Sequence, residues 1–183
     1  PIADMFTLRL ERTKSGRVSY EGKFVESLDV TIGEYDVTAT CGENVLLGKD
    51  APYYIGQAHV DVKAEQTNTV KIPCRVGNAL VSVTFGRNDA ERERFNRYYS
   101  DYGLLVRIGD YSMAISKDET ASSIYFPAGS SPEFVFYGTL NNEAAQIVST
   151  NVSHKNLPSV FEAADHASIT ITLPDPESAL AVN

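Results

Sequence analysis

The sequence predicts an all-β protein with one short helix. Three observations support this fold class: apolar and polar residues alternate with a period of two in most segments, turn-forming residues separate these segments, and one stretch alone shows helical spacing. Alternation places one face of each strand in a core and the other in water. Antiparallel sheets packed as sandwiches have this property, so we expect antiparallel β-sandwich modules.

Six strands are predicted in the first 86 residues. Their alternating apolar positions lie in residues 6–10, 28–32, 35–41, 58–64, 70–76 and 79–85. Gly77 and Asn78 separate the last two strands and accept positive φ, which predicts a two-residue hairpin. Pro73 cannot donate to a ladder, which predicts an edge strand or a bulge at that position. Residues 42–52 are expected to form a loop because of their Gly, Asn, Asp and Pro content.

Residues 88–99 form the predicted helix. Asn88 is a suitable N-cap, and Glu91 stands three residues later, as in a capping box. The apolar stripe consists of Phe95, Tyr98, Tyr99 and Tyr102. One interpretation makes this stripe a ligand-stacking platform. The other, which we favour, is that the stripe docks the helix on a sheet.

The β pattern returns after Gly103. Further strands are predicted at residues 104–108, 111–115, 123–126, 134–140, 147–148 and 167–173. The chain therefore divides into an N-terminal β-sandwich domain, 1–86, and a C-terminal β-rich domain, 87–183, which opens with the helix. A closely packed single domain is the alternative division.

Composition excludes several classes of partner. The formal net charge is −8 and no run of Lys or Arg occurs, which argues against nucleic acid and anionic lipid. No apolar run approaches the roughly 20 residues that a membrane helix needs, so we expect no membrane-spanning segment.

The two cysteines, Cys41 and Cys74, fall on the apolar faces of their predicted strands. The favoured interpretation is a pair of buried thiols, because free cysteine is among the most buried residue types. A disulfide between them is the alternative and would require an oxidising compartment. A zinc site is disfavoured because no CxxC pair is present.

No motif for catalysis, phosphate binding or calcium binding is present. His59 and Asp61 share the polar face of one predicted strand, but no third metal ligand is apparent, so a solvated face is favoured. We therefore expect no enzymatic activity, no metal and no cofactor. Tyr53, Tyr54 and Tyr125 lie near predicted strand ends, where loops of sandwiches commonly bind ligands, and are candidate ligand-binding aromatics.

The order of several segments resembles a known family. The segments are YDVTATCG, APYYIGQAHVDVKAEQTNTVKIPCRVGNALVSVTF, DYGLLVRIG and SSIYFPAG, and the likeness extends over residues 6–173. Together they resemble the fimbrillin-like adhesins of Bacteroides-type gut bacteria, which are surface lipoproteins. The resemblance implies transthyretin-like or immunoglobulin-like sandwich modules, export, and a lipid anchor in the precursor. It also implies assembly by strand exchange, for which residues 6–10 are the candidate strand.

The resemblance and the missing catalytic motifs lead to two functional hypotheses. The first is a non-enzymatic adhesin or fimbrial subunit at the cell surface or outer membrane. Its partners would be a host or bacterial surface protein or glycan, or other pilus subunits. The second is a carbohydrate-binding surface module of a glycan-uptake system, which requires an exposed aromatic platform.

Overall fold

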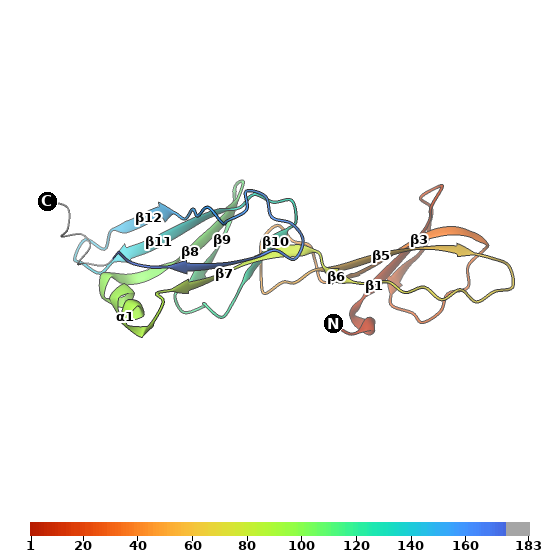
Figure 1. The fold of residues 1–183 in the computed structure, drawn as a ribbon, viewed down its shortest axis with the longest axis horizontal. Helices are drawn as coiled ribbons and strands as arrows, with labels where there is room; N and C mark the ends of the chain where they lie inside the picture. The colour runs from red at the N-terminus through yellow and green to blue at the C-terminus, as the bar shows by residue number, and fades with distance from the viewer. Residues whose placement is uncertain (175–183) are drawn as a thin grey trace. The chain divides into compact units, whose positions relative to one another are not determined.

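The computed structural model describes residues 1–174 and divides the chain into two compact units (Figure 1). The first unit comprises Pro1–Asn44 and Pro52–Asn78, and the second comprises Val45–Ala51 and Ala79–Asn183. The boundary at residue 78 differs from the sequence-based boundary at residue 86, because the strand between them contributes its apolar side chains to the core of the second unit. Residues 175–183 of the predicted C-terminal domain lie outside the described residues.

The first unit contains one antiparallel sheet, the first-unit sheet, with the strand order β2-β1-β3-β5-β6. Its strands are β1 (Thr7–Arg12), β2 (Val18–Lys23), β3 (Gly33–Cys41), β5 (Tyr54–Val62) and β6 (Arg75–Val76). A short 3-10 helix, η1 (Ala3–Met5), precedes β1. The longest ladder joins β3 to β5 along the full nine residues of each strand.

One face of the first-unit sheet is apolar. Its buried side chains are Leu8, Leu10, Tyr35, Val37 and Ala39. Irregular segments cover this face in place of a second sheet: Val30 and Ile72 pack against its core cluster. A Cβ atom at Gly56 would lie 2.6 Å from Cys74 Sγ and 2.7 Å from the Pro73 carbonyl oxygen, so the covering segment requires glycine at this position.

Three expectations for the first unit are wrong. Residues 28–32 are not a strand, and of residues 70–76 only the last two pair with a neighbour, because Pro73 interrupts the ladder. The Gly77-Asn78 hairpin is absent from the described residues, since β6 belongs to the first-unit sheet whereas the next strand joins another sheet. Strand β2 was not predicted because its sequence, VSYEGK, carries little apolar alternation.

The second unit is a sandwich of two four-stranded sheets. The β7 sheet has the order β13-β7-β10-β4, and the β8 sheet has the order β12-β11-β8-β9. Their strands are β4 (Gly48–Lys49), β7 (Asn78–Phe85), β8 (Tyr99–Ile108), β9 (Tyr111–Ser116), β10 (Ile124–Pro127), β11 (Glu133–Leu140), β12 (Ile147–Asn151) and β13 (His166–Ile171). Antiparallel pairing dominates, but β13 runs parallel to β7.

Both sheets of the second unit contribute to one core. Val81 and Val83 of β7, Ile124 of β10 and Leu104 and Val106 of β8 are at most 2% exposed. The all-β class with one short helix is therefore confirmed for the described residues, and the second unit has the expected sandwich form. Transthyretin-like or immunoglobulin-like connectivity stays a prediction.

Helix α1 (Asp89–Tyr98) docks on this core through one aromatic ring. Phe95 is fully buried, with its ring centroid 5.2 Å from that of Tyr102 and 5.9 Å from that of Phe85. Tyr98, by contrast, is 50% exposed. Tyr99 and Tyr102 belong to β8 rather than to the helix, so the predicted stripe extends over two elements. The burial of Phe95 and Tyr102 fits docking of the helix rather than a stacking platform.

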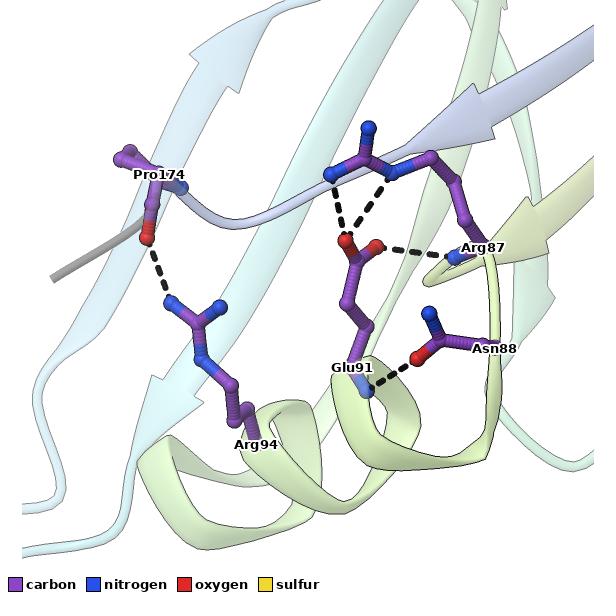
Figure 2. Close-up of polar contacts among 5 residues, drawn as sticks. All are labelled: Arg87, Asn88, Glu91, Arg94 and Pro174. Atoms are coloured by element: carbon purple, nitrogen blue, oxygen red, sulfur yellow. Dashed lines mark hydrogen bonds and ion pairs between the residues drawn. The ribbon is translucent and has the colours of Figure 1, made fainter. Parts of the chain in front are cut away.

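The N-terminus of α1 is capped as the sequence predicts. Asn88 Oδ1 accepts a hydrogen bond from the Glu91 backbone N–H at 3.0 Å (Figure 2). Glu91 differs from the predicted capping box, because its carboxylate accepts from the backbone N–H and guanidinium of Arg87. These hydrogen bonds to Arg87 hold the pKa of the Glu91 carboxyl below its usual range. Arg94, one turn further on, donates to the carbonyl of Pro174.

Candidate ligand-binding surfaces

The three candidate aromatics lie in both units. Tyr53 and Tyr54 belong to the first unit and Tyr125 to the second, and all three side chains are half-buried. The backbone of Tyr53 is held by Asn78, whose Oδ1 accepts from the Tyr53 N–H at 3.1 Å. Asn78 is fully buried, so its side chain has a structural role at this point.

Tyr54 lines an apolar groove in the first unit, the first-unit groove. This hollow has a volume of about 380 Å³ and is lined by Pro1, Ala3, Phe6, Leu8, Phe24, Ala39, Tyr54, Val70, Ile72 and Cys74. The phenol of Tyr54 and the thiol of Cys74 are its polar side-chain groups. Such a lining suits apolar groups, because it offers few hydrogen-bond partners to a polar ligand.

The cysteines are less buried than expected. Cys41 is partly buried at the end of β3, and Cys74 is exposed. The expectation of two buried thiols is therefore wrong, because Cys74 lies in the irregular segment that covers the first-unit sheet rather than in a strand. Local burial still raises the pKa of the Cys74 thiol. The disulfide alternative stays a prediction.

A larger hollow, the β13 groove, lies in the second unit beside β13. Its volume is about 750 Å³. Apolar lining comes from Val152, Leu157, Pro158, Phe161, Ala167 and Ile169, and polar lining comes from Ser153, His154, Asn156, Asp165, His166, Ser168 and Thr170. An apolar hollow with several convergent polar groups is the usual form of a small-molecule site. No local pattern in the sequence marks this groove, because only folding brings residues 152–158 beside residues 165–170.

Both imidazoles of the β13 groove are oriented by hydrogen bonds. His154 Nδ1 accepts from the backbone N–H of Asn156 at 3.2 Å, so Nε2 is the nitrogen that carries the proton in the neutral ring. His166 Nε2 lies 2.8 Å from Ser82 Oγ on the neighbouring strand. The carboxylate of Asp165 accepts a hydrogen bond from the backbone N–H of Glu162.

The third histidine, His59, lies on the polar face of the first-unit sheet. Its Nδ1 is 2.9 Å from Asp36 Oδ1, and Asp36 is its direct cross-strand neighbour in the β3–β5 register. The hydrogen bond to Asp36 raises the pKa of His59 and lowers the pKa of Asp36. The sequence pattern groups His59 with Asp61, which lies on the same face of the same strand. It does not identify Asp36 as the partner, because the register between two strands cannot be read from one strand. Within residues 1–174, no cluster of three or more His, Cys, Asp or Glu residues is arranged to hold a metal ion.

Two solved structures share this fold along most of both chains. One is a Bacteroides thetaiotaomicron protein whose name assigns it provisionally to polysaccharide binding (DUF1812); it is 12% identical, with a TM-score of 0.55, and the match covers 94% of this chain and 84% of that one. The other is a Bacteroides uniformis protein named provisionally for cell adhesion; it is 13% identical, with a TM-score of 0.51 and coverages of 93% and 87%. At these identities the likeness shows the fold alone.

Comparison of this sequence with those of known proteins and families shows which family the chain belongs to. No curated protein matches this sequence. No helix within residues 1–174 is long and apolar enough to cross a membrane. The family model described as a domain of unknown function, DUF4493, matches residues 5–182, which is almost the whole chain. The chain therefore belongs to the DUF4493 family.

Proposed function

We propose that this chain is an exported, non-enzymatic surface protein that acts as an adhesin or a fimbrial subunit. The observation that carries the proposal is the fold likeness over 94% and 93% of the chain to Bacteroides proteins provisionally named for polysaccharide binding and cell adhesion. The fimbrillin-like segments of the sequence support the same class. Export to the cell surface or outer membrane follows from this role.

The architecture suits recognition without catalysis. Long ladders such as β3–β5 and β8–β11 give stiff sheets, and these sheets end in loops and exposed edge strands. Loops on a rigid scaffold and free strand edges are common sites of protein and glycan recognition. The partners would be a surface protein, a glycan or another subunit of a pilus.

The fimbrial form of the proposal concerns β1, the candidate strand for exchange between subunits. β1 lies inside the first-unit sheet, between β2 and β3, and Phe6 and Leu8 line the first-unit groove. Removal of this strand would leave the backbone groups of β2 and β3 that pair with it without partners, and it would widen the first-unit groove. A strand from a second subunit could then restore both sets of hydrogen bonds.

Deletion of residues 1–10 tests this form. If subunits assemble through β1, the deletion abolishes the oligomers that the intact chain forms, as measured by light scattering after chromatography. Because the deletion also opens the sheet, circular dichroism must show a retained β spectrum. A synthetic peptide of residues 1–12, added in excess, serves as the rescue control. Unchanged oligomers after the deletion would contradict strand exchange.

A carbohydrate-binding surface module is the second candidate function. The β13 groove favours it, because hydroxyl, amide and imidazole groups line it together with apolar side chains. Sugars present both hydroxyl groups and apolar C–H faces, so such a lining complements them.

An array that carries glycans and extracellular-matrix proteins separates these functions. A reproducible hit on a protein supports the adhesin against the carbohydrate-binding module, whereas a hit on a glycan is compatible with both. Tyr54→Ala and Tyr125→Ala are informative variants, because each removes the candidate aromatic of one unit. An array without any hit would contradict both binding roles. A structural subunit of a fimbria would then be the remaining function.

A further inference from the structure

The outer face of the β7 sheet carries a group of uncharged polar side chains. On β7 and β13, alternate residues are buried in the core, so the residues between them face outward. The parallel register places Ser168 beside Ser82, Thr170 beside Thr84 and His166 beside Leu80, which is the apolar member of the outward set on β7. Tyr125 of β10 lies between the fully buried Ile124 and Phe126 and therefore also points outward. We name Ser82, Thr84, Tyr125, His166, Ser168 and Thr170 the hydroxyl face.

The hydroxyl face differs from the other outward sheet faces in its charge. On the β8 sheet, Arg107 of β8 pairs with Glu133 of β11. On the first-unit sheet, Arg9 pairs with Glu11 and Glu21, and further carboxylates flank His59. The outward positions of β7 and β13, together with Tyr125 of β10, hold no Asp, Glu, Lys or Arg, although 22% of the chain is charged.

An uncharged face rich in hydroxyl groups selects the class of ligand. An anionic or cationic polymer gains no ion pairs with Asp, Glu, Lys or Arg on this face, and Asp165 is the one carboxylate that lines the adjoining groove, so the electrostatic attraction that usually dominates binding of such a polymer is weak. A neutral sugar gains donors and acceptors from Ser, Thr and His, and the Tyr125 ring offers a surface for its C–H groups. The contact with Ser82 Oγ at 2.8 Å fixes the orientation of the His166 ring.

The free edge of β13 extends this surface into the β13 groove. The carbonyls of Asp165 and Ile171 accept hydrogen bonds from Leu80 and Gly86 on the β7 side. Because backbone groups of successive residues point to opposite sides of a strand, those of Ser168 and Thr170 point to the free edge. The same two residues line the groove, so one ligand chain can contact the face and the groove together.

We propose that the hydroxyl face and the β13 groove form the binding site for a neutral polysaccharide. This inference rests on the proposed carbohydrate-binding function and adds its location and its ligand class. The sequence did not single out Ser82, Ser168 or Thr170, because Ser and Thr at alternate strand positions are common on any solvated sheet.

A charge substitution tests the site. Ser168→Arg places a bulky cation on the exposed face of an edge strand, where the fold should tolerate it. Ser149→Arg is the matched control, since Ser149 is likewise exposed and lies on β12, an edge strand of the other sheet. The probes are glucan, mannan and xylan as neutral polysaccharides, and polygalacturonate as an anionic one. Affinity electrophoresis gives the relative affinities, and circular dichroism checks folding.

We expect the native chain to bind at least one neutral polysaccharide more tightly than polygalacturonate. Ser168→Arg should weaken that binding by at least about tenfold, which corresponds to ~1.4 kcal/mol, whereas Ser149→Arg should match the native chain. Thr170→Arg provides a second variant should Ser168→Arg fail to fold.

Imidazole NMR of the native chain gives a readout that needs no variant. The chain has three histidines, of which His154 and His166 line the groove and His59 lies in the first unit. Addition of the bound polysaccharide should shift the His166 resonances and leave those of His59 unchanged.

The outcomes separate the inference from the function on which it rests. Binding that Ser168→Arg and Thr170→Arg leave intact, with unshifted His166 resonances, overturns the site while the carbohydrate-binding function stands. Binding of polygalacturonate alone overturns the neutral ligand class. No binding of any polysaccharide overturns the function and the site together.

Discussion

Glu91 shows how a buried charge can serve structure alone. It is one of the few buried polar residues of the described chain, a type of position that often marks a functional site. Here its carboxylate is satisfied by the backbone and guanidinium of Arg87, and its backbone N–H is satisfied by Asn88. The network closes the first turn of α1, so the burial of Glu91 is explained by helix capping.

Asn88→Ala should lower the free energy of unfolding by about 1 kcal/mol, because the Glu91 N–H loses its acceptor. Asn88→Asp should retain most of the stability, since aspartate also caps helices. Urea unfolding measures both. Asn142→Ala, in an exposed turn, is the control and should change stability by less than ~0.5 kcal/mol. A loss for Asn88→Ala no larger than the control would argue against the cap.

The environment of Glu119 predicts that the stability of the fold decreases in acid. Hydrogen bonds from Lys49 Nζ and from the hydroxyl and backbone N–H of Ser116 lower its pKa from 4.5 to about 2. Since the folded pKa is below the unfolded one, the carboxylate stabilises the fold above about pH 4.5, and this contribution is lost as the pH falls toward 2.

Glu119→Gln should therefore flatten the dependence of stability on pH between about 5 and 2. Urea midpoints at several pH values measure the slope. Glu143→Gln, which alters an exposed loop carboxylate, should leave the slope unchanged. If Glu119→Gln shows the same slope of stability against pH as the native chain, other carboxylates, such as Asp36, are responsible for the acid sensitivity.

At the scale of elements, α1 depends on one aromatic ring rather than on a stripe. Phe95→Ala should lower the free energy of unfolding by about 3–5 kcal/mol, because it leaves a cavity beside Phe85 and Tyr102. Tyr98→Ala should cost less than ~0.5 kcal/mol, because that ring is half exposed. Thermal and urea unfolding of both variants compare the two rings. Similar losses would mean that the helix docks through both residues.

Pairing with a neighbouring strand decides whether several segments form strands, and the period-two pattern alone predicts these segments wrongly. The alternation in residues 70–76 suggests a strand, yet Pro73 and the crossing over Gly56 turn most of it into a cover for the sheet. β2 has weak alternation but forms because β1 supplies a ladder partner. A strand is stabilised by pairing with a neighbouring strand, and the sequence of one segment does not specify which strand that neighbour is.

At the scale of the whole chain, the two units differ in the size of their cores. The described core cluster of the first unit contains three buried residues, Leu10, Tyr35 and Val37, whereas that of the second contains sixteen. Local stability follows the number of buried apolar contacts. The first unit should therefore open more readily than the second.

Hydrogen exchange measured by mass spectrometry tests this difference. Amides of β3 should exchange at least about tenfold faster than those of β8 and β11, although all three strands are paired on both sides. Exposed edge strands are excluded from the comparison, because their amides lack partners. Equal protection of the two sets would show that the irregular cover of the first-unit sheet stabilises it as well as a second sheet would.

The sequence by itself determined the all-β class, the helix with its Asn88 cap, and most strands with strong alternation, because these depend on local spacing and on side chains a few residues apart. Only the tertiary structure decided the Asp36–His59 pair, the parallel β13–β7 ladder and the β13 groove. Each of these requires register or contact between segments far apart in the chain. The hydroxyl face belongs to the second kind, because Ser82 and Ser168 become neighbours only when two distant strands pair.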